Sequence, residues 1–137
     1  MRTLLLSGGV VVTCDAGHTV HAPGDVVLED DRIAYVGPRY DGEYDQRFSA
    51  GGKLIMPGLI NAHTHSPMSI FRGVADDVDL QVFLEERVWP REICLTPKDV
   101  YAGAVLSYIE MLQCGVTTCV DMYLYEEELV RAALDTG

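Results

Sequence analysis

Two histidines, His63 and His65, stand one residue apart at the end of an apolar run. In a β-strand, residues i and i+2 point to the same side, so both imidazoles would project into one space. Neutral imidazole nitrogen binds zinc and related divalent metals, and a catalytic zinc takes three protein ligands beside an open position. No histidine follows His65, so the pair is predicted to be half of a metal site. A hydrogen-bonded, purely structural pair is the alternative that the spacing leaves open.

The elements around the pair must position it. Residues 59–63 are typical of a short apolar strand, and residues 116–122 carry no charge before Asp121, as expected for a buried parallel strand. Between them, a helix is predicted to begin with Thr96 as N-cap and to end just before Gly115. Other expected elements are an irregular loop at 66–77, a helix at 80–88 and a helix from residue 126. Alternating strands and helices indicate an α/β fold, with the histidines at the carboxyl end of a strand, where active sites form.

The first 55 residues follow a different pattern of short strands and turns. We expect a hairpin around Asp30 and Asp31, because strand-like residues flank them on both sides. The expected strands cover residues 4–13, 25–29, 32–36 and 53–56, with a polar, glycine-rich loop at 39–52.

The charge and hydrophobic content of the chain limit the kinds of partner that it can bind. The chain has 137 residues, 48% of them hydrophobic, and its 21 acidic against 10 basic residues give a formal net charge of −11. This charge disfavours nucleic acid and anionic membranes as partners. No apolar stretch is long enough to cross a bilayer. The four cysteines include no CxxC pair, so we expect free thiols and a cytoplasmic location.

Several motifs together resemble one enzyme family. They are Pro-Gly-Leu-Ile-Asn-Ala-His-Thr-His at 57–65, Arg-Gly-Val-Ala-Asp-Asp at 72–77, Trp-Pro-Arg-Glu at 89–92 and Gly-Val-Thr-Thr-Cys-Val-Asp-Met-Tyr at 115–123. Over essentially the whole chain, the sequence resembles the amidohydrolase superfamily. It looks most like the 5-methylthioadenosine/S-adenosylhomocysteine deaminase branch, near the cytosine deaminase and triazine hydrolase relatives.

The resemblance implies a fold and a set of site residues. Residues 1–56 would be strands of a small β-sandwich, and residues 57–137 the first two βα units of a metal-dependent (β/α)8 barrel that is incomplete in this chain. His63 and His65 would bind one divalent metal ion, zinc in the first instance, with iron, nickel or cobalt as alternatives. Glu92 would accept hydrogen bonds from the ribose hydroxyls of a substrate, and a surface or helix-capping role is its alternative. Asp121 is expected to have a structural role or to support a metal ligand from outside, with a direct ligand role as the alternative. Trp89 is expected to be a packing anchor, with stacking on the substrate as the alternative.

The resemblance also implies a reaction. The complete enzyme would deaminate an adenosine-like substrate, S-adenosylhomocysteine or 5-methylthioadenosine, to the inosyl product and ammonia. Its catalytic residues are expected downstream of Gly137, so this chain would be an N-terminal portion that is inactive alone, and the complete protein a homo-oligomer. One alternative is another amidohydrolase that acts on a ring amine or chloride, of the cytosine deaminase, guanine deaminase or triazine hydrolase type. A second is a non-enzymatic piece completed by a partner chain.

Overall fold

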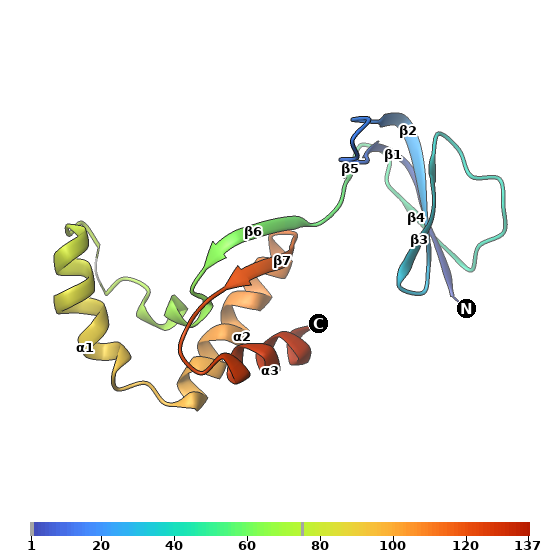
Figure 1. Ribbon diagram of the computed structural model, residues 1–137. Helices are drawn as coiled ribbons and strands as arrows, with labels where there is room; N and C mark the ends of the chain where they lie inside the picture. The colour runs from blue at the N-terminus through green and yellow to red at the C-terminus, as the bar shows by residue number, and fades with distance from the viewer. Residues whose placement is uncertain (1, 75) are drawn as a thin grey trace. The chain divides into compact units, whose positions relative to one another are not determined.

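The computed structural model describes residues 2–74 and 76–137, and it divides into two compact units (Figure 1). The first unit is Met1–Pro57 and the second is Gly58–Gly137. No helix of the described residues has both the length and the apolar character that a membrane span requires. Each unit is described by itself below.

The first unit is a single five-stranded sheet. Its strands are β1 (Thr3–Val12), β2 (Val20–Glu29), β3 (Arg32–Gly37), β4 (Gln46–Ser49) and β5 (Leu54–Ile55). The order is β3-β2-β1-β4, with β5 also paired to β1. The β2–β3 hairpin is antiparallel, whereas β4 and β5 both run parallel to β1. The predicted hairpin at Asp30 and Asp31 is therefore confirmed.

One prediction for the first unit is wrong. Residues 39–52 were expected to form a loop throughout, but Gln46–Ser49 forms β4 beside β1. All four residues of β4 are exposed, and three of them are polar, so the segment lacks the apolar alternation that marks a half-buried strand. Backbone hydrogen bonds to β1 form this strand, and the order of its side chains does not reveal them.

The second unit is built on a parallel pair of strands. Its elements are β6 (Leu59–Thr64), the short helix η1 (Ser66–Phe71), the π-helix η2 (Val82–Val88), α1 (Trp89–Glu92), α2 (Pro97–Gln113), β7 (Val116–Asp121) and α3 (Glu126–Thr136). Strands β6 and β7 pair in parallel, with Leu59 opposite Val116 and Thr64 opposite Asp121. Figure 1 shows α2 and α3 beside this pair. The α/β class predicted from the sequence is confirmed.

Helix α2 begins and ends where the sequence predicts. The Thr96 side chain accepts a hydrogen bond from the Asp99 amide, and the Asp99 carboxylate accepts from the Thr96 amide, which together form a capping box. Beyond the last turn, Gly115 has a φ of +80°, a left-handed conformation that glycine adopts without a steric penalty. The helix can therefore stop there and lead directly into β7.

Three features of the second unit differ from expectation. The predicted irregular loop contains the short helix η1, although Ala75 of that loop lies outside the described residues. The helix expected at 80–88 is wound as a π-helix over Val82–Val88 and continues through α1 to Glu92. Strand β7 is parallel as predicted but not buried, since Val120 is 61% exposed. Among the described residues β7 pairs with β6 alone, which leaves its other edge open.

Gly103 on α2 lets the helix approach the turn that follows the histidines. A Cβ atom at this position would lie 2.6 Å from the carbonyl oxygen of Pro67. We expect Gly103→Ala to destabilise the chain by about 1–3 kcal/mol through overpacking, despite a helix-propensity gain of about 1 kcal/mol. Urea unfolding monitored by circular dichroism would measure the change. Ala102→Gly, at the exposed neighbouring position, should cost only the propensity difference, and a more stable Gly103→Ala chain would contradict the close packing.

Candidate metal and substrate site

The two histidines converge at the carboxyl end of β6. The Nε2 atoms of His63 and His65 lie 3.2 Å apart, and the two rings meet edge to face at an angle of 88°. His63 is the penultimate residue of the strand, and His65 is the first residue beyond it. The alternation expected of a strand thus brings both imidazoles to one side.

The orientation of the His65 ring is set by a backbone carbonyl. Its Nδ1 atom lies 2.6 Å from the carbonyl oxygen of Met122, directly after β7. A carbonyl oxygen can only accept, so Nδ1 carries the proton and Nε2 keeps its lone pair in the neutral ring. The lone pair of Nε2 therefore faces the His63 ring.

This geometry fits two ligands of one metal ion. With zinc–nitrogen bonds of about 2.0–2.1 Å and tetrahedral angles, two ligand nitrogens lie about 3.3 Å apart. The observed separation of 3.2 Å is close to this value. Within residues 2–74 and 76–137, no group of three or more His, Cys, Asp or Glu side chains is arranged to hold a metal ion. The described residues therefore offer two imidazole donors and no third ligand.

Asp121 lies beside the pair and makes two hydrogen bonds of its own. Its Oδ1 accepts from the Ser66 amide at 3.1 Å, and its Oδ2 accepts from the Tyr108 hydroxyl at 2.8 Å. Each carboxylate oxygen thus has a hydrogen-bond partner other than the two histidines. These contacts are compatible with the structural or supporting role expected of Asp121, which stays a prediction.

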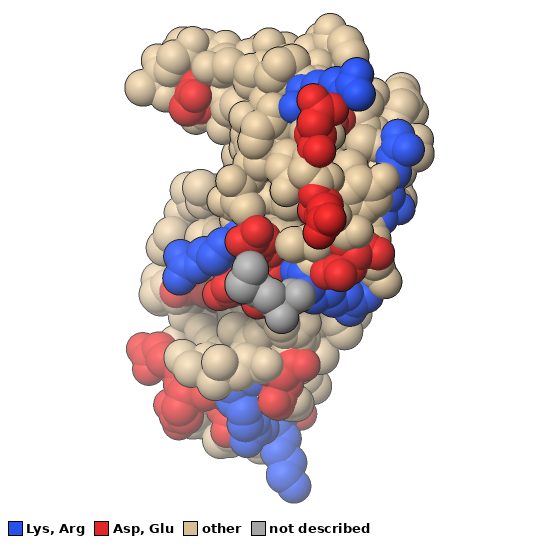
Figure 2. All heavy atoms as spheres, turned by 90° about the vertical axis from the view of Figure 1, so that its right-hand side faces the viewer, with Lys and Arg blue, Asp and Glu red and all other residues tan. Residues whose placement is uncertain are grey.

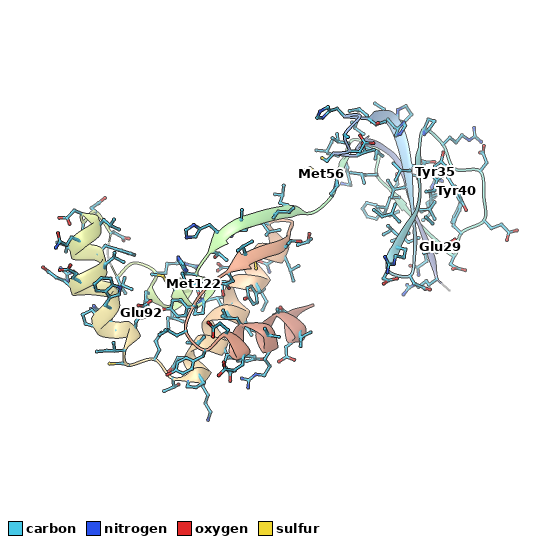
Figure 3. All side chains as sticks on the ribbon, in the orientation of Figure 1. Glu29, Tyr35, Tyr40, Met56, Glu92 and Met122 are labelled. Atoms are coloured by element: carbon cyan, nitrogen blue, oxygen red, sulfur yellow. The ribbon has the colours of Figure 1, made fainter. Side chains whose placement is uncertain are left out.

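An open hollow of about 580 Å³ adjoins His65. Its walls come from η1, η2, α1, the segment after β7 and the start of α3. They are mostly apolar: Met68, Phe83, Leu84, Val88, Trp89, Met122, Tyr123 and Leu124, with Glu92 and Glu126. Figure 3 labels Glu92, at the end of α1, and Met122, after β7. The structure therefore brings Glu92 to the same hollow as His65. Trp89, expected to be a packing anchor, is 49% exposed.

Tyr123 brings a buried hydroxyl to this hollow. The side chain is 8% exposed, and the hydroxyl has no hydrogen-bond partner among the described residues. Burial first, and then the nearby Glu92 carboxylate, raise the pKa of Tyr123 above its ordinary value. The hydroxyl lies near Glu92 without the geometry of a hydrogen bond, so it is available as a protonated donor.

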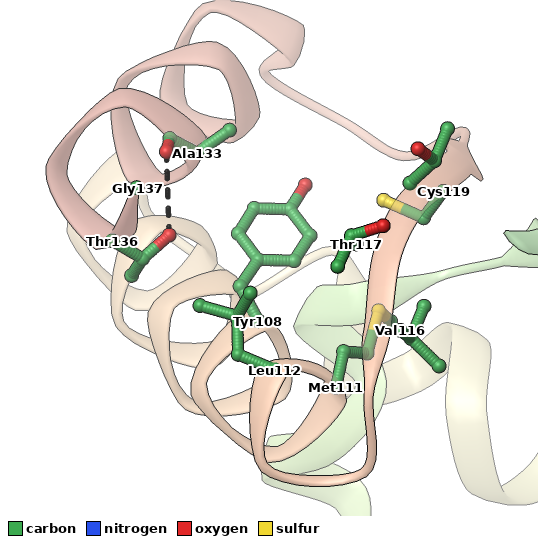
Figure 4. Close-up of a pocket in the computed structure, with 10 residues that line it drawn as sticks. Tyr108, Met111, Leu112, Val116, Thr117, Cys119, Ala133, Thr136 and Gly137 are labelled. Carbon is green, nitrogen blue, oxygen red and sulfur yellow. Dashed lines mark hydrogen bonds between the residues drawn. The ribbon is translucent and has the colours of Figure 1, made fainter. Parts of the chain in front are cut away.

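A second, smaller cavity lies elsewhere in the unit. Figure 4 shows the Tyr108 ring between β7 and α3, with Thr117 and Cys119 on the strand side and Ala133 on the helix side. This cavity measures about 100 Å³ and shares no lining residue with the hollow. Its walls come from α2, β7 and α3, and none of the residues predicted to bind metal or substrate lines it.

Sequence reasoning missed the residues that support the pair. Tyr108 lies inside the predicted helix that begins at Thr96, and Ser66 begins the predicted loop, but neither position signals a role beside the histidines. A tyrosine at helical spacing gives no sign of where its hydroxyl points. The contacts that give these residues a role span 13 positions for Tyr108 and Asp121 and 55 for Ser66 and Asp121.

Charged side chains show no segregation on the face drawn in Figure 2. Acidic and basic groups alternate over it, without a continuous basic patch. That distribution is compatible with the prediction that the chain does not bind nucleic acid, which stays a prediction.

The comparisons with known proteins agree on one family. Residues 54–137 match the model of the amidohydrolase family. The chain is 44% identical over 135 residues to the 5-methylthioadenosine/S-adenosylhomocysteine deaminase of Pyrococcus horikoshii, which covers 98% of this chain and 32% of that protein. It is 38% identical over 137 residues to the 5'-deoxyadenosine deaminase of Methanosarcina mazei, covering 100% of this chain and 32% of that protein.

A solved structure gives the same result. The adenosine deaminase from Xanthomonas campestris with bound zinc superposes with a TM-score of 0.90 at 32% identity, over 98% of this chain and 32% of that one. The chain belongs to the amidohydrolase family. The predicted resemblance is therefore confirmed, including its deaminase branch. The chain spans about a third of the length of the curated relatives it matches.

Proposed function

We propose that this chain supplies the first two metal ligands and one substrate-binding carboxylate of a metal-dependent aminohydrolase. The substrate is an adenosine-like nucleoside, S-adenosylhomocysteine or 5-methylthioadenosine, which is converted to the inosyl product and ammonia. The observation that carries the proposal is the 3.2 Å separation of the His63 and His65 Nε2 atoms, with His65 fixed in the tautomer a ligand needs. Membership of the amidohydrolase family and the names of the relatives support the reaction class.

The same proposal assigns the two parts of the chain. Residues 57–137 are the first two βα units of a (β/α)8 barrel, and residues 1–56 are strands of a small β-sandwich. The parallel β6–β7 pair joined through α2 supports the first assignment. The remaining ligands and the proton shuttle come from polypeptide outside these 137 residues, on the same or on a second chain. The metal is zinc, with iron, nickel or cobalt as alternatives.

Local geometry supports the role proposed for His65, and the family resemblance together with the position of Glu92 supports the role proposed for Glu92. The Met122 carbonyl holds the Nδ1–H of His65, which directs the Nε2 lone pair toward His63. Glu92 accepts hydrogen bonds from the ribose hydroxyls, a task that suits a carboxylate with two oxygens in the hollow beside His65. The apolar side chains that line the hollow shield the purine ring of the substrate from water. When bound, the metal ion would act as a Lewis acid that makes water nucleophilic near neutral pH.

A chimera tests the proposal. Residues 1–137 replace the matching segment of the Pyrococcus horikoshii protein, which then supplies the other two thirds of the enzyme. The chimera should release ammonia from 5-methylthioadenosine, and Glu92→Ala should raise KM for this nucleoside about 10- to 100-fold, because two ribose hydroxyls lose their charged acceptor. Its KM for the free base adenine should stay unchanged. An enzyme-coupled ammonia assay measures both.

Three controls make the outcome decisive. Glu126→Ala removes a second carboxylate from the same hollow, so an equal effect on KM would assign the loss to general charge rather than to Glu92. The 137-residue chain alone should release no ammonia above a His63→Ala version, because its described residues offer two donors only. A folded but inactive chimera, beside an active parent enzyme, would contradict the proposed function.

A further inference from the structure

Consecutive residues at the ends of β6 and β7 are joined by three hydrogen bonds. The Met122 amide donates to the Thr64 carbonyl at 3.3 Å, and the Met122 carbonyl accepts from His65 Nδ1 at 2.6 Å. One residue further on, the Ser66 amide donates to the Asp121 carboxylate at 3.1 Å. The ladder between the two strands is thus extended past Thr64 by side chains. His65 lies in the middle of this extension.

Two hydroxyl groups of helix α2 also bind the residues that follow β6 and end β7. The Tyr108 hydroxyl donates to Asp121 Oδ2 at 2.8 Å, and the Ser107 hydroxyl donates to the Ser66 carbonyl at 2.7 Å. Tyr108 is 7% exposed and Ser66 is 2% exposed, so water does not compete for these bonds. Burial, and then the bond to Asp121, raise the pKa of Tyr108 to about 12, which keeps its hydroxyl a donor at neutral pH.

We propose that Asp121, oriented by Tyr108, is a positioning residue that sets the conformation of His65 for metal binding, an inference that rests on the proposed function. Asp121 fixes the backbone at Ser66, directly after His65, while its own neighbour Met122 fixes the imidazole ring. One aspartate therefore links the residue that bears the ligand to the carbonyl that orients it. Asp121 is not proposed as a third ligand, because no group of three or more His, Cys, Asp or Glu side chains among the described residues is arranged to hold a metal ion.

A merely structural role is the competing explanation, and the chain contains a matched control for it. Tyr101, also on α2, donates from its hydroxyl to Asp135 at 2.8 Å, the same length as the bond from Tyr108 to Asp121. Asp135 lies on α3, and none of the hydrogen bonds of His63 and His65 among the described residues involves Tyr101 or Asp135. Removal of either tyrosine–aspartate bond should lower stability, but only the bond at Asp121 should change the state of His65.

The test uses the purified 137-residue chain and two readouts. Nitrogen-15 NMR of the metal-free chain reports the tautomer of His65, and calorimetric titration with Zn²⁺ alone reports affinity. We expect Asp121→Ala to replace the single Nδ1–H tautomer of His65 by a mixture of two tautomers. Zn²⁺ binding should weaken about tenfold, which is the lower end of the loss seen when a residue that supports a metal ligand is removed. Tyr108→Phe should act in the same direction with a smaller effect. Asp135→Ala and Tyr101→Phe should leave both readouts unchanged.

The conservative variant Asp121→Asn should restore most of the Zn²⁺ affinity that Asp121→Ala loses. Its amide oxygen can still accept from Ser66, and its amide nitrogen can donate to Tyr108, so Zn²⁺ affinity should return to within about threefold of the wild type. If Asp121→Ala does not fold, Tyr108→Phe decides, since its ring still fills the core. Unchanged tautomer and affinity in a folded Tyr108→Phe or Asp121→Ala chain would overturn the inference. A wild-type chain whose Zn²⁺ affinity equals that of His65→Ala would instead overturn the proposed function, while the tautomer readout still decides the role of Asp121.

Discussion

Replacing His65 with alanine is expected to weaken Zn²⁺ binding by this chain at least about 100-fold, because a direct ligand contributes more than the outer contacts whose loss costs about 10- to 100-fold. The His63 and His65 imidazoles converge, and no group of three or more potential ligands occurs among the described residues. Loss of one leaves a single donor, which holds a divalent ion no better than a surface histidine. Calorimetric titration of the purified chain at pH 7.5 would measure the change.

The first unit provides the control for this prediction. His18 is exposed and distant in sequence from the pair, and its φ is +49°. Asparagine tolerates that left-handed conformation better than alanine, so His18→Asn removes an imidazole with little strain. Zn²⁺ affinity should not change in this variant. An equal loss in His18→Asn, or an unchanged affinity in His65→Ala, would show that Zn²⁺ binds elsewhere on the chain.

The sequence predicts those parts of the fold that depend on local chemistry. The bounds of α2 follow from Thr96, Asp99 and Gly115, since a cap and a left-handed glycine act within one turn of the helix. The apolar run at 59–63 predicts β6, and the alternation of side chains predicts that His63 and His65, the latter just beyond the strand, point to one side. Strand β4 could not be predicted, because polar exposed residues hold it only through backbone bonds to β1.

In the candidate site too, features that depend on local sequence could be predicted, and features that depend on contacts between distant residues could not. The histidine pair is visible in the sequence, but its orientation depends on Met122, 57 positions away. Glu92 could be placed only through the family resemblance, because no spacing relates it to His65. Residues Val82–Val88, which precede Glu92, form a π-helix. The spacing of their apolar side chains fits an α-helix equally well, so the π-helix could not be predicted from it.

The second large effect concerns Asp25 in the first unit. Its side chain is 8% exposed, and it accepts hydrogen bonds from the Gly8 amide at 2.9 Å and the Tyr40 amide at 2.8 Å. Gly8 has a φ of +77° and lies where the register between β1 and β2 is irregular, so its amide cannot use the ordinary strand ladder. Asp25 is thus the acceptor that lets β1 bend at this point and ties the segment after β3 to it.

Asp25→Ala should therefore lower the free energy of unfolding by about 3 kcal/mol, because two partly buried amides lose a charged acceptor worth about 1.5 kcal/mol or more each. Asp25→Asn keeps one acceptor oxygen and should lose about half as much. Asp45 is a matched control: it accepts from the Thr3 amide and hydroxyl at 2.7 Å and 2.9 Å in an exposed setting, where water can replace it. Urea unfolding at pH 7 should thus rank Asp25→Ala as the most destabilised, and an equal loss in Asp45→Ala would show that the burial of Asp25 adds nothing.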